Sequence, residues 1–175
     1  MGSPRTTAVL DPAFVEGIKD YPTEEVRRRR DESLAEREFQ SYLRRQVQVR
    51  QDILAAERSR REAGREPAPL VEQLTSVMAK GPRSRRSRGE AFRMSLTDAD
   101  IEEAERQLGV MLPDFSLDDP PALEDEELAE ALATLSKVER AVSSRRAKVN
   151  RVHDRLQEEL KRRYRENPAE IPREL

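Results

Sequence analysis

Apolar residues recur along two long stretches of the sequence in alternating steps of four and three, and no other feature limits the fold as much. The first series, with one polar member, is Ala35, Phe39, Tyr42, Gln46, Val49, Ile53 and Ala56. The second series is Ala131, Leu135, Val138, Val142, Arg145, Val149, Val152 and Leu156. This spacing is typical of the seam of a coiled coil. We therefore expect an all-α protein in which two long helices form an antiparallel coiled coil, with short helices in the connector.

Helix-starting and helix-ending residues divide the chain into segments. Pro22 precedes acidic residues and favours a helix start, whereas Gly64 and Pro67 end the pattern. Acidic residues begin the second stretch, and Pro168 ends it. The predicted segments are a flexible tail (1–21), a long helix (22–64), a connector (65–124), a second long helix (125–167) and a C-terminal tail (168–175).

The connector contains signals for two short helices and two loops. Pro69–Met78 has an amphipathic pattern, and Thr97 is placed to cap a helix that ends near Gly109. Between them, Lys80–Glu90 is a basic Gly/Ser/Arg loop, and the acidic, proline-broken Pro113–Ala122 has the composition of a linker.

Composition limits the kinds of function that the chain can carry. Apolar residues make up 35% of it and charged residues 39%, which is enough for a thin helical seam but not for a thick core. Because there is no cysteine, disulfides and thiolate metal sites are excluded, and no phosphate-binding loop or zinc spacing is present. The single histidine, His153, is expected on the surface. We expect a cytoplasmic protein without enzymatic activity, metal or membrane contact.

A short polar pattern occurs once in each predicted long helix, with steps of three, four and four. The first copy is Ser41, Arg44, Gln48 and Asp52, and the second is Ser143, Arg146, Asn150 and Asp154. Four residues before each serine, the first copy has Arg37 and the second has Glu139. At about 100° per residue, each set covers only about 80° of the helix surface and forms one stripe.

Antiparallel pairing would bring the two stripes level and run them in opposite directions, around a local two-fold axis. Arginine forms paired hydrogen bonds with a guanine edge or meets phosphate, and a carboxylate accepts hydrogen bonds from guanine. These groups suit a two-fold symmetric, anionic, guanine-bearing ligand such as a cyclic dinucleotide. The spacing alone favours an ordinary solvated helical face over a ligand site.

The two copies resemble the twin E-x-x-x-S-x-x-R-x-x-x-Q-x-x-x-D motif of RsiG, the anti-sigma factor family of actinobacteria. The second copy matches at Glu139, Ser143, Arg146 and Asp154, with Asn150 in place of glutamine. The first copy matches at Ser41, Arg44, Gln48 and Asp52, with Arg37 in place of glutamate.

The resemblance implies that two cyclic di-GMP molecules bind on the coiled coil, and that the loaded protein sequesters a WhiG-type sigma factor. Transcription of sporulation genes is thereby inhibited, without direct DNA binding by the protein. The resemblance assigns guanine or phosphate contacts to Arg44 and Arg146, and guanine edges to Asp52, Asp154 and Glu139. It leaves the remaining contacts to Ser41, Ser143, Gln48 and Asn150.

One apolar surface and one acidic surface are expected to contact the sigma factor. Leu43, Val47 and Leu54 widen the apolar face of the first helix, and the acidic segment 114–130 suits a basic sigma surface. Two other functions stay open from the sequence. One is a ligand-independent coiled-coil adaptor, and the other is a nucleic-acid-binding protein that uses the arginine runs 27–30 and 83–88.

Overall fold

A computed structural model describes residues 3–64, 96–111 and 119–171. Its α-helices are α1 (Pro4–Leu10), α2 (Thr23–Glu62), α4 (Asp98–Met111) and α5 (Asp125–Glu166). Three single turns of 3₁₀ helix accompany them: Pro12–Phe14, Pro120–Ala122 and Pro168–Glu170. These residues contain helices and no strands, so the prediction of an all-α fold is confirmed for the part of the chain that the structure describes.

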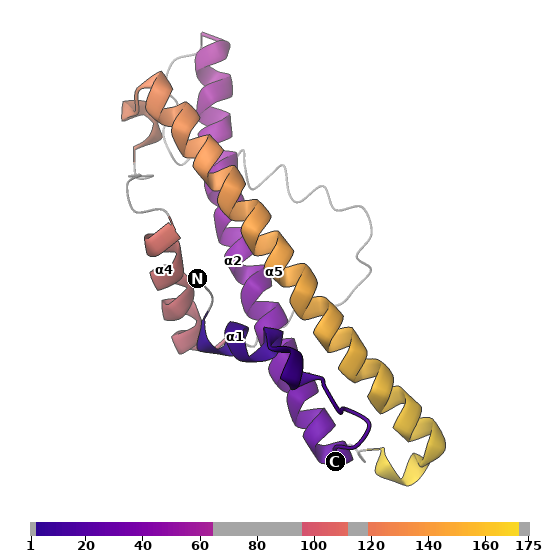
Figure 1. The fold of residues 1–175 in the computed structure, drawn as a ribbon. Coiled ribbons are helices and arrows are strands. Elements are labelled where there is room, and N and C mark those ends of the chain that lie inside the picture. Colours follow the sequence, from indigo (N-terminus) through magenta and orange to yellow (C-terminus); the bar gives the residue numbers. More distant parts are fainter. Residues whose placement is uncertain (1–2, 65–95, 112–118, 172–175) are drawn as a thin grey trace.

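Helices α2 and α5 run side by side in opposite directions and form the long axis of the molecule (Figure 1). Near one end, Arg61 of α2 bonds to Asp125 at 2.6 Å. Near the other end, Arg27 donates to the hydroxyl of Tyr164 at 2.8 Å. At 1.5 Å per residue each helix is roughly 60 Å long. The predicted antiparallel pair is therefore confirmed.

The buried face of α5 agrees with the predicted seam over most of its length. The buried members of that seam are Ala131, Leu135, Val142, Val149 and Leu156, with Leu128 and Leu160 extending it. The histidine prediction is wrong, because His153 takes a seam position and is 8% exposed. Its Nδ1 lies 3.2 Å from the hydroxyl of Ser33 on α2.

The seam predicted for α2 is wrong by one residue except at Phe39, which is fully buried. The shift of one residue rotates the buried face by about 100°. Leu43, Val47 and Leu54 are fully buried, whereas Val49 of the predicted seam is 38% exposed. Consequently these three residues belong to the core between the helices and are not a surface for a sigma factor.

Polar residues in the true seam explain this error. Ser33, Glu36, Gln40 and Glu57 are all fully buried, so the buried face of α2 does not stand out as the apolar one. Burial is tolerated because the charges are paired: Glu57, for example, accepts hydrogen bonds from Arg60 and Arg61 on its own helix.

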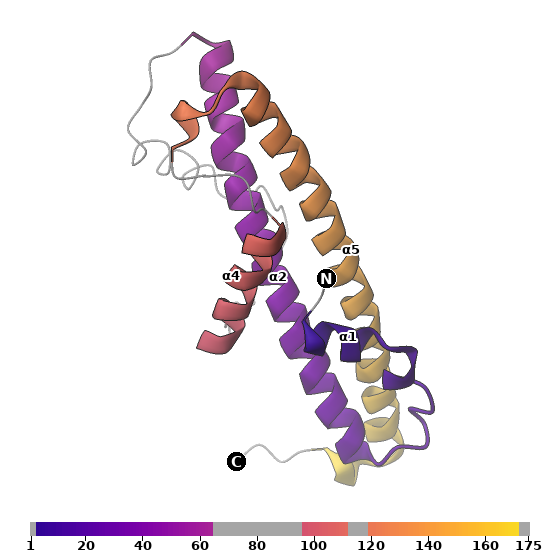
Figure 2. The ribbon, with the colours of Figure 1, turned by 60° about the vertical axis from the view of Figure 1, so that its left-hand side comes forward.

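The N-terminal segment differs from the flexible tail expected for residues 1–21. Helix α1 packs against α2 (Figure 2). Its residue Val9 is fully buried. Arg5 holds the segment in place by donating to Glu36 of α2 at 2.9 Å and to Asp100 of α4 at 2.7 Å. Thr6 also donates to Glu36, at 2.6 Å. This packing was hard to predict from the sequence because its anchors, Arg5 and Thr6, are polar.

Helix α4 lies on the same side of the pair as α1 (Figure 2) and adds Ala104 and Leu108 to the core that contains Phe39 and Leu43. The predicted cap is confirmed, since the amide of Asp100 donates to the Thr97 hydroxyl at 3.2 Å. The predicted helix Pro69–Met78 and the loop Lys80–Glu90 lie outside the described residues.

Among the described helices, none combines the length and the apolar character that crossing a membrane requires.

Candidate functional site

Two reciprocal hydrogen bonds join the polar stripes at the middle of the helix pair. Nε of Arg44 donates to the hydroxyl of Ser143 at 2.9 Å. Nε of Arg146 donates to the hydroxyl of Ser41 at 2.9 Å. The arginine of each copy thus meets the serine of the other copy. The structure therefore brings the two copies together around a local two-fold axis.

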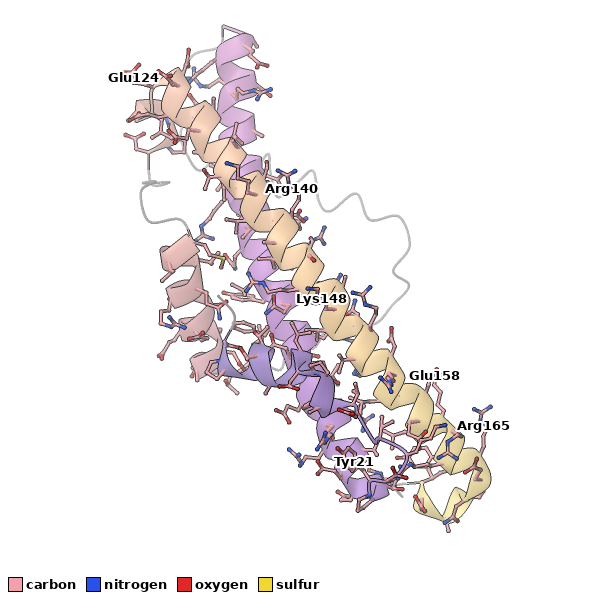
Figure 3. All side chains as sticks on the ribbon, viewed as in Figure 1. Tyr21, Glu124, Arg140, Lys148, Glu158 and Arg165 are labelled. Atoms are coloured by element: carbon pink, nitrogen blue, oxygen red, sulfur yellow. The ribbon has the colours of Figure 1, made fainter. Side chains whose placement is uncertain are left out.

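The helical spacing of each copy explains its position on the pair. Ser41 lies two residues after Phe39, about 200° further round α2, and Phe39 packs in the core that includes α4 residues. The site residues accordingly lie on the edge of the pair away from α4, and the side chains of the helix pair are drawn in Figure 3. Figure 3 labels Lys148, an exposed residue of α5. Because Lys148 follows Arg146 by two residues, it lies about 200° further round this helix.

Each serine donates a hydrogen bond to the residue four positions earlier in its own helix. Ser143 donates to the carboxylate of Glu139 at 2.8 Å. Ser41 donates to the backbone carbonyl of Arg37 at 2.7 Å, because the side chain of Arg37 cannot accept. In both cases the hydroxyl oxygen remains available to accept from an arginine.

In one half of the site, Glu139 neutralises the charge of Arg44. It accepts from Nε of Arg44 at 2.9 Å as well as from Ser143. Burial raises the pKa of Glu139, but the hydrogen bonds from Ser143 and Arg44 outweigh that effect, and the net shift is downward. The carboxylate is therefore ionised and paired at neutral pH.

Arg146 has no such partner in the other half. Among the described residues its one hydrogen bond is to the neutral hydroxyl of Ser41, and it forms no ion pair. Burial lowers the pKa of Arg146, and the nearby charges of Arg44 and Arg37 lower it further. A partly buried cation with cationic neighbours gains from an incoming anion.

The outer members of each copy extend the site toward opposite ends of the pair. Gln48 and Asn150 are partly buried, and the side-chain oxygen of Asn150 is buried without a hydrogen-bond partner among the described residues. Asp52 and Asp154 are exposed. Because Ser41 is level with Arg146, the two aspartates are separated by roughly 28 Å along the bundle. All nine predicted residues thus lie along one continuous edge.

This edge divides into two half-sites, each drawing on both helices. The first, which we call the Glu139 half-site, comprises Arg44, Gln48, Asp52, Glu139 and Ser143. The second, which we call the Arg37 half-site, comprises Arg37, Ser41, Arg146, Asn150 and Asp154. The sequence pattern identified the members of each copy, but not that the arginines and serines are exchanged between the helices.

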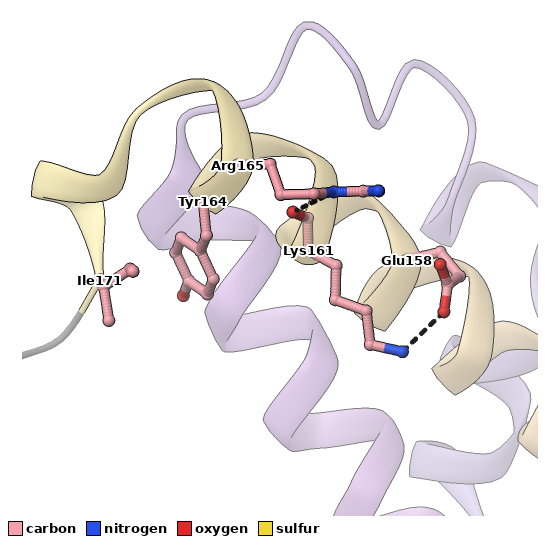
Figure 4. Close-up of a pocket in the computed structure, with 5 residues that line it drawn as sticks. All are labelled: Glu158, Lys161, Tyr164, Arg165 and Ile171. Atoms are coloured by element: carbon pink, nitrogen blue, oxygen red, sulfur yellow. Dashed lines mark hydrogen bonds and ion pairs between the residues drawn. The ribbon is translucent and has the colours of Figure 1, made fainter.

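Other parts of the described chain offer weaker candidates for a site. A pocket of about 440 Å³ lies at the C-terminal end of α5, lined by Glu158, Lys161, Tyr164, Arg165 and Ile171 (Figure 4). It is shallow, and Glu158 is already paired with Lys161 at 2.7 Å. Within residues 3–64, 96–111 and 119–171, no cluster of acidic or histidine side chains is arranged to hold a metal.

The arginine run 27–30 is paired with acidic residues of its own helix, although the side chain of Arg28 is 61% exposed. Arg28 and Arg29 both bond to Glu25, and Arg30 bonds to Asp31. The guanidinium of Arg29 also lies over the ring of Tyr21, 4.3 Å from its centroid. The second run, 83–88, lies outside the described residues.

The fold and the site define an all-α protein built on an antiparallel helix pair, with a two-fold polar site across its two long helices. The model of the RsiG-like family matches residues 12–78 of this chain, so the resemblance found in the sequence is confirmed over this region. The match contains Ser41–Asp52 and does not extend to α5. No curated protein matches the chain.

Proposed function

We propose that this protein is an anti-sigma factor that binds two molecules of cyclic di-GMP on its helix pair and then sequesters a WhiG-type sigma factor in the cytoplasm. Binding of the sigma factor would keep it from RNA polymerase and so inhibit transcription of sporulation genes. The RsiG-like match supports the anti-sigma role, and the arrangement of the polar edge supports the ligand.

The reciprocal bonds of Arg44 and Arg146 carry the proposal. Cyclic di-GMP has two guanines and two phosphates related by a two-fold axis, and it is an anion. The edge of the helix pair also has a local two-fold axis, with a guanidinium on each side of it. Each arginine is held by a serine of the other helix, so a ligand would meet donors that are already oriented.

The remaining groups match the hydrogen-bonding pattern of the ligand. Carboxylates accept from the N1 and N2 groups of guanine, and Asp52, Asp154 and Glu139 supply them. Guanidinium groups donate to phosphate oxygens or to the O6 and N7 atoms of guanine. The unpartnered oxygen of Asn150 is a further acceptor for a base amino group.

Ligand binding would create the surface that the sigma factor recognises. The apolar residues Leu43, Val47 and Leu54 are buried in the core and cannot provide it. The bound nucleotides and the edge residues around them would then supply much of the contact. The exposed acidic residues Asp125, Glu126 and Glu127 at the start of α5 suit a basic surface of the partner, whereas residues 114–118 lie outside the described part.

One observation favours the ligand-independent adaptor as a second candidate. Arg44 already has a carboxylate partner in Glu139, so half of the edge is neutralised without any ligand. An adaptor of this kind would bind its partner equally well with and without nucleotide.

Size-exclusion chromatography of the protein with a purified WhiG-type sigma factor separates the two candidates. The proposed function predicts a complex with cyclic di-GMP and free proteins without it. Cyclic di-AMP serves as the control nucleotide, and the double variant Arg44→Ala, Arg146→Ala should give no complex under any condition. A complex that forms regardless of nucleotide and in the double variant would support the adaptor.

A further inference from the structure

We infer that the two half-sites are functionally different: the Arg37 half-site selects its ligand through phosphate, and the Glu139 half-site selects through the guanine base. This inference rests on the proposed function and deepens it. It makes Arg37 a specificity-determining residue and implies that the two ligands bind in order rather than equivalently.

The contacts at the two serines carry the inference. Ser143 and Arg44 converge on the carboxylate of Glu139, at 2.8 and 2.9 Å. At the position related by the local two-fold axis, the side chain is the guanidinium of Arg37, and Ser41 turns to a backbone carbonyl instead. The symmetry of the edge is therefore broken by one pair of residues of opposite charge.

The difference in charge between the half-sites is large for so small a region. In the Glu139 half-site, two carboxylates, Glu139 and Asp52, outnumber one guanidinium. In the Arg37 half-site, two guanidinium groups, Arg37 and Arg146, outnumber the carboxylate of Asp154. Asp154 is exposed at the far end of its copy, whereas Arg146 is partly buried at the centre. The phosphates of a ligand would consequently be attracted more strongly to the Arg37 half-site.

The hydrogen-bonding chemistry leads to the same division. A guanidinium offers only donors, so Arg37 and Arg146 together suit a phosphodiester, whose oxygens only accept. A carboxylate offers only acceptors, so Glu139 suits the N1–H and N2–H groups of guanine and repels phosphate. Adenine lacks those donors, and the Glu139 half-site would therefore discriminate between the bases more strongly.

An order of binding follows from this division. The Arg37 half-site would fill first at low ionic strength, because its attraction for the anion does not depend on the base. The same attraction would weaken more with added salt, since partly exposed charges are screened. The Glu139 half-site would fill second and would restrict the fully loaded protein to cyclic di-GMP.

Calorimetric titration of cyclic di-GMP into the full chain tests this inference, with the protein wild type, Arg37→Glu or Lys148→Glu. Lys148→Glu makes the same change in charge on an exposed position of α5 away from the edge. The titrations are made at about 0.05 M and about 0.3 M salt, where the Debye length falls from roughly 14 to 6 Å. Circular dichroism confirms that each variant is folded.

We expect two resolved steps in the wild type, differing at least about tenfold in affinity at low salt, with the tighter step losing more affinity at high salt. Arg37→Glu should bring the two steps within about threefold of each other, and Lys148→Glu should leave them apart. Two equal steps in the wild type, or unchanged steps in Arg37→Glu, would overturn the inference while leaving the proposed function intact. Absence of binding to the wild type, alone and with the sigma factor, would overturn both.

Discussion

Arg44 and Arg146 are related by a local two-fold axis, and each donates from Nε, at the same 2.9 Å, to a serine hydroxyl on the opposite helix. The relationship makes the polar edge a single unit that requires both helices in register. It also orients both guanidinium groups before any ligand arrives. The two arginines differ in one respect: within the described part of the chain, Arg44 has a carboxylate partner and Arg146 does not.

This difference predicts unequal effects of removing the two serines. Ser41→Ala removes the one hydrogen bond of Arg146 within the described residues, whereas Arg44 keeps Glu139 in Ser143→Ala. We expect Ser41→Ala to weaken cyclic di-GMP binding by about tenfold and Ser143→Ala by about threefold, since a bond to a charged group contributes roughly 1.5 kcal/mol. Fluorescence anisotropy with a labelled ligand measures both. A larger loss in Ser143→Ala would contradict the account of the arginines.

The cluster of like charges around Arg146 predicts that Arg37→Glu stabilises the protein without ligand. Glutamate at this position would remove the repulsion on Arg146 and add a carboxylate that Ser41 can donate to, as Ser143 does to Glu139. The expected gain in the free energy of unfolding is about 0.5–1 kcal/mol, because the pair is partly exposed. Thermal unfolding at low salt, with Lys148→Glu as the control, measures it. A lower melting temperature in Arg37→Glu than in wild type would argue against repulsion at this position.

The observed register of α2 predicts opposite sensitivities at two neighbouring apolar positions. Leu43 is fully buried, and Leu43→Ala should lower the free energy of unfolding by about 2–5 kcal/mol. Val49 is 38% exposed, and Val49→Ala should cost less than about 1 kcal/mol. Urea denaturation of the two variants compares them directly. A larger loss in the free energy of unfolding for Val49→Ala than for Leu43→Ala would contradict the observed register and favour the seam expected from the sequence.

Acid should weaken the end of the bundle where Glu159 lies. The hydrogen bond from Arg162 lowers the pKa of Glu159 from 4.5 to about 2, with help from Arg163 and against the effect of burial. The stabilisation is therefore complete above pH 4.5 and is lost as the pH falls through about 2. We expect a loss of only about 1 kcal/mol, because Arg162 is 40% exposed and screened by solvent.

Urea denaturation of wild type and Glu159→Gln, at about pH 5 and about pH 2.5, isolates this contribution. The wild type should lose more stability on acidification than the variant, by the amount that Glu159 contributes. An equal loss in both proteins would assign the acid sensitivity to other carboxylates, such as Glu25 and Glu57.

The helix pair was predictable because its evidence is periodic and extends over many turns of each helix. The register of α2 was not, because two apolar stripes compete on that helix. Tyr42, Val49 and Ile53 follow the heptad spacing as regularly as Leu43, Val47 and Leu54 do. The choice depends on whether Glu36 and Gln40 can be buried. Their partners, Arg5 for Glu36 and Thr6 for Gln40, are distant in sequence.

The members of the site were predictable for the same reason, since the two copies repeat one spacing. Their mutual contacts were not, because a hydrogen bond between Arg146 and Ser41 depends on the register of two helices about a hundred residues apart. The packing of α1 and the burial of His153 were missed because polar contacts, with Glu36 and Ser33, accompany both.

Isothermal titration calorimetry of cyclic di-GMP, with cyclic di-AMP as the control, tests the central claim most directly. The account predicts two molecules of cyclic di-GMP per chain and no more than one of cyclic di-AMP. It also predicts a loss of at least about a hundredfold in affinity for cyclic di-GMP in the Arg44→Ala, Arg146→Ala double variant, with its helicity retained. Silent titrations of the wild type, both alone and with the sigma factor present, would contradict the claim that this edge of the helix pair is a nucleotide site.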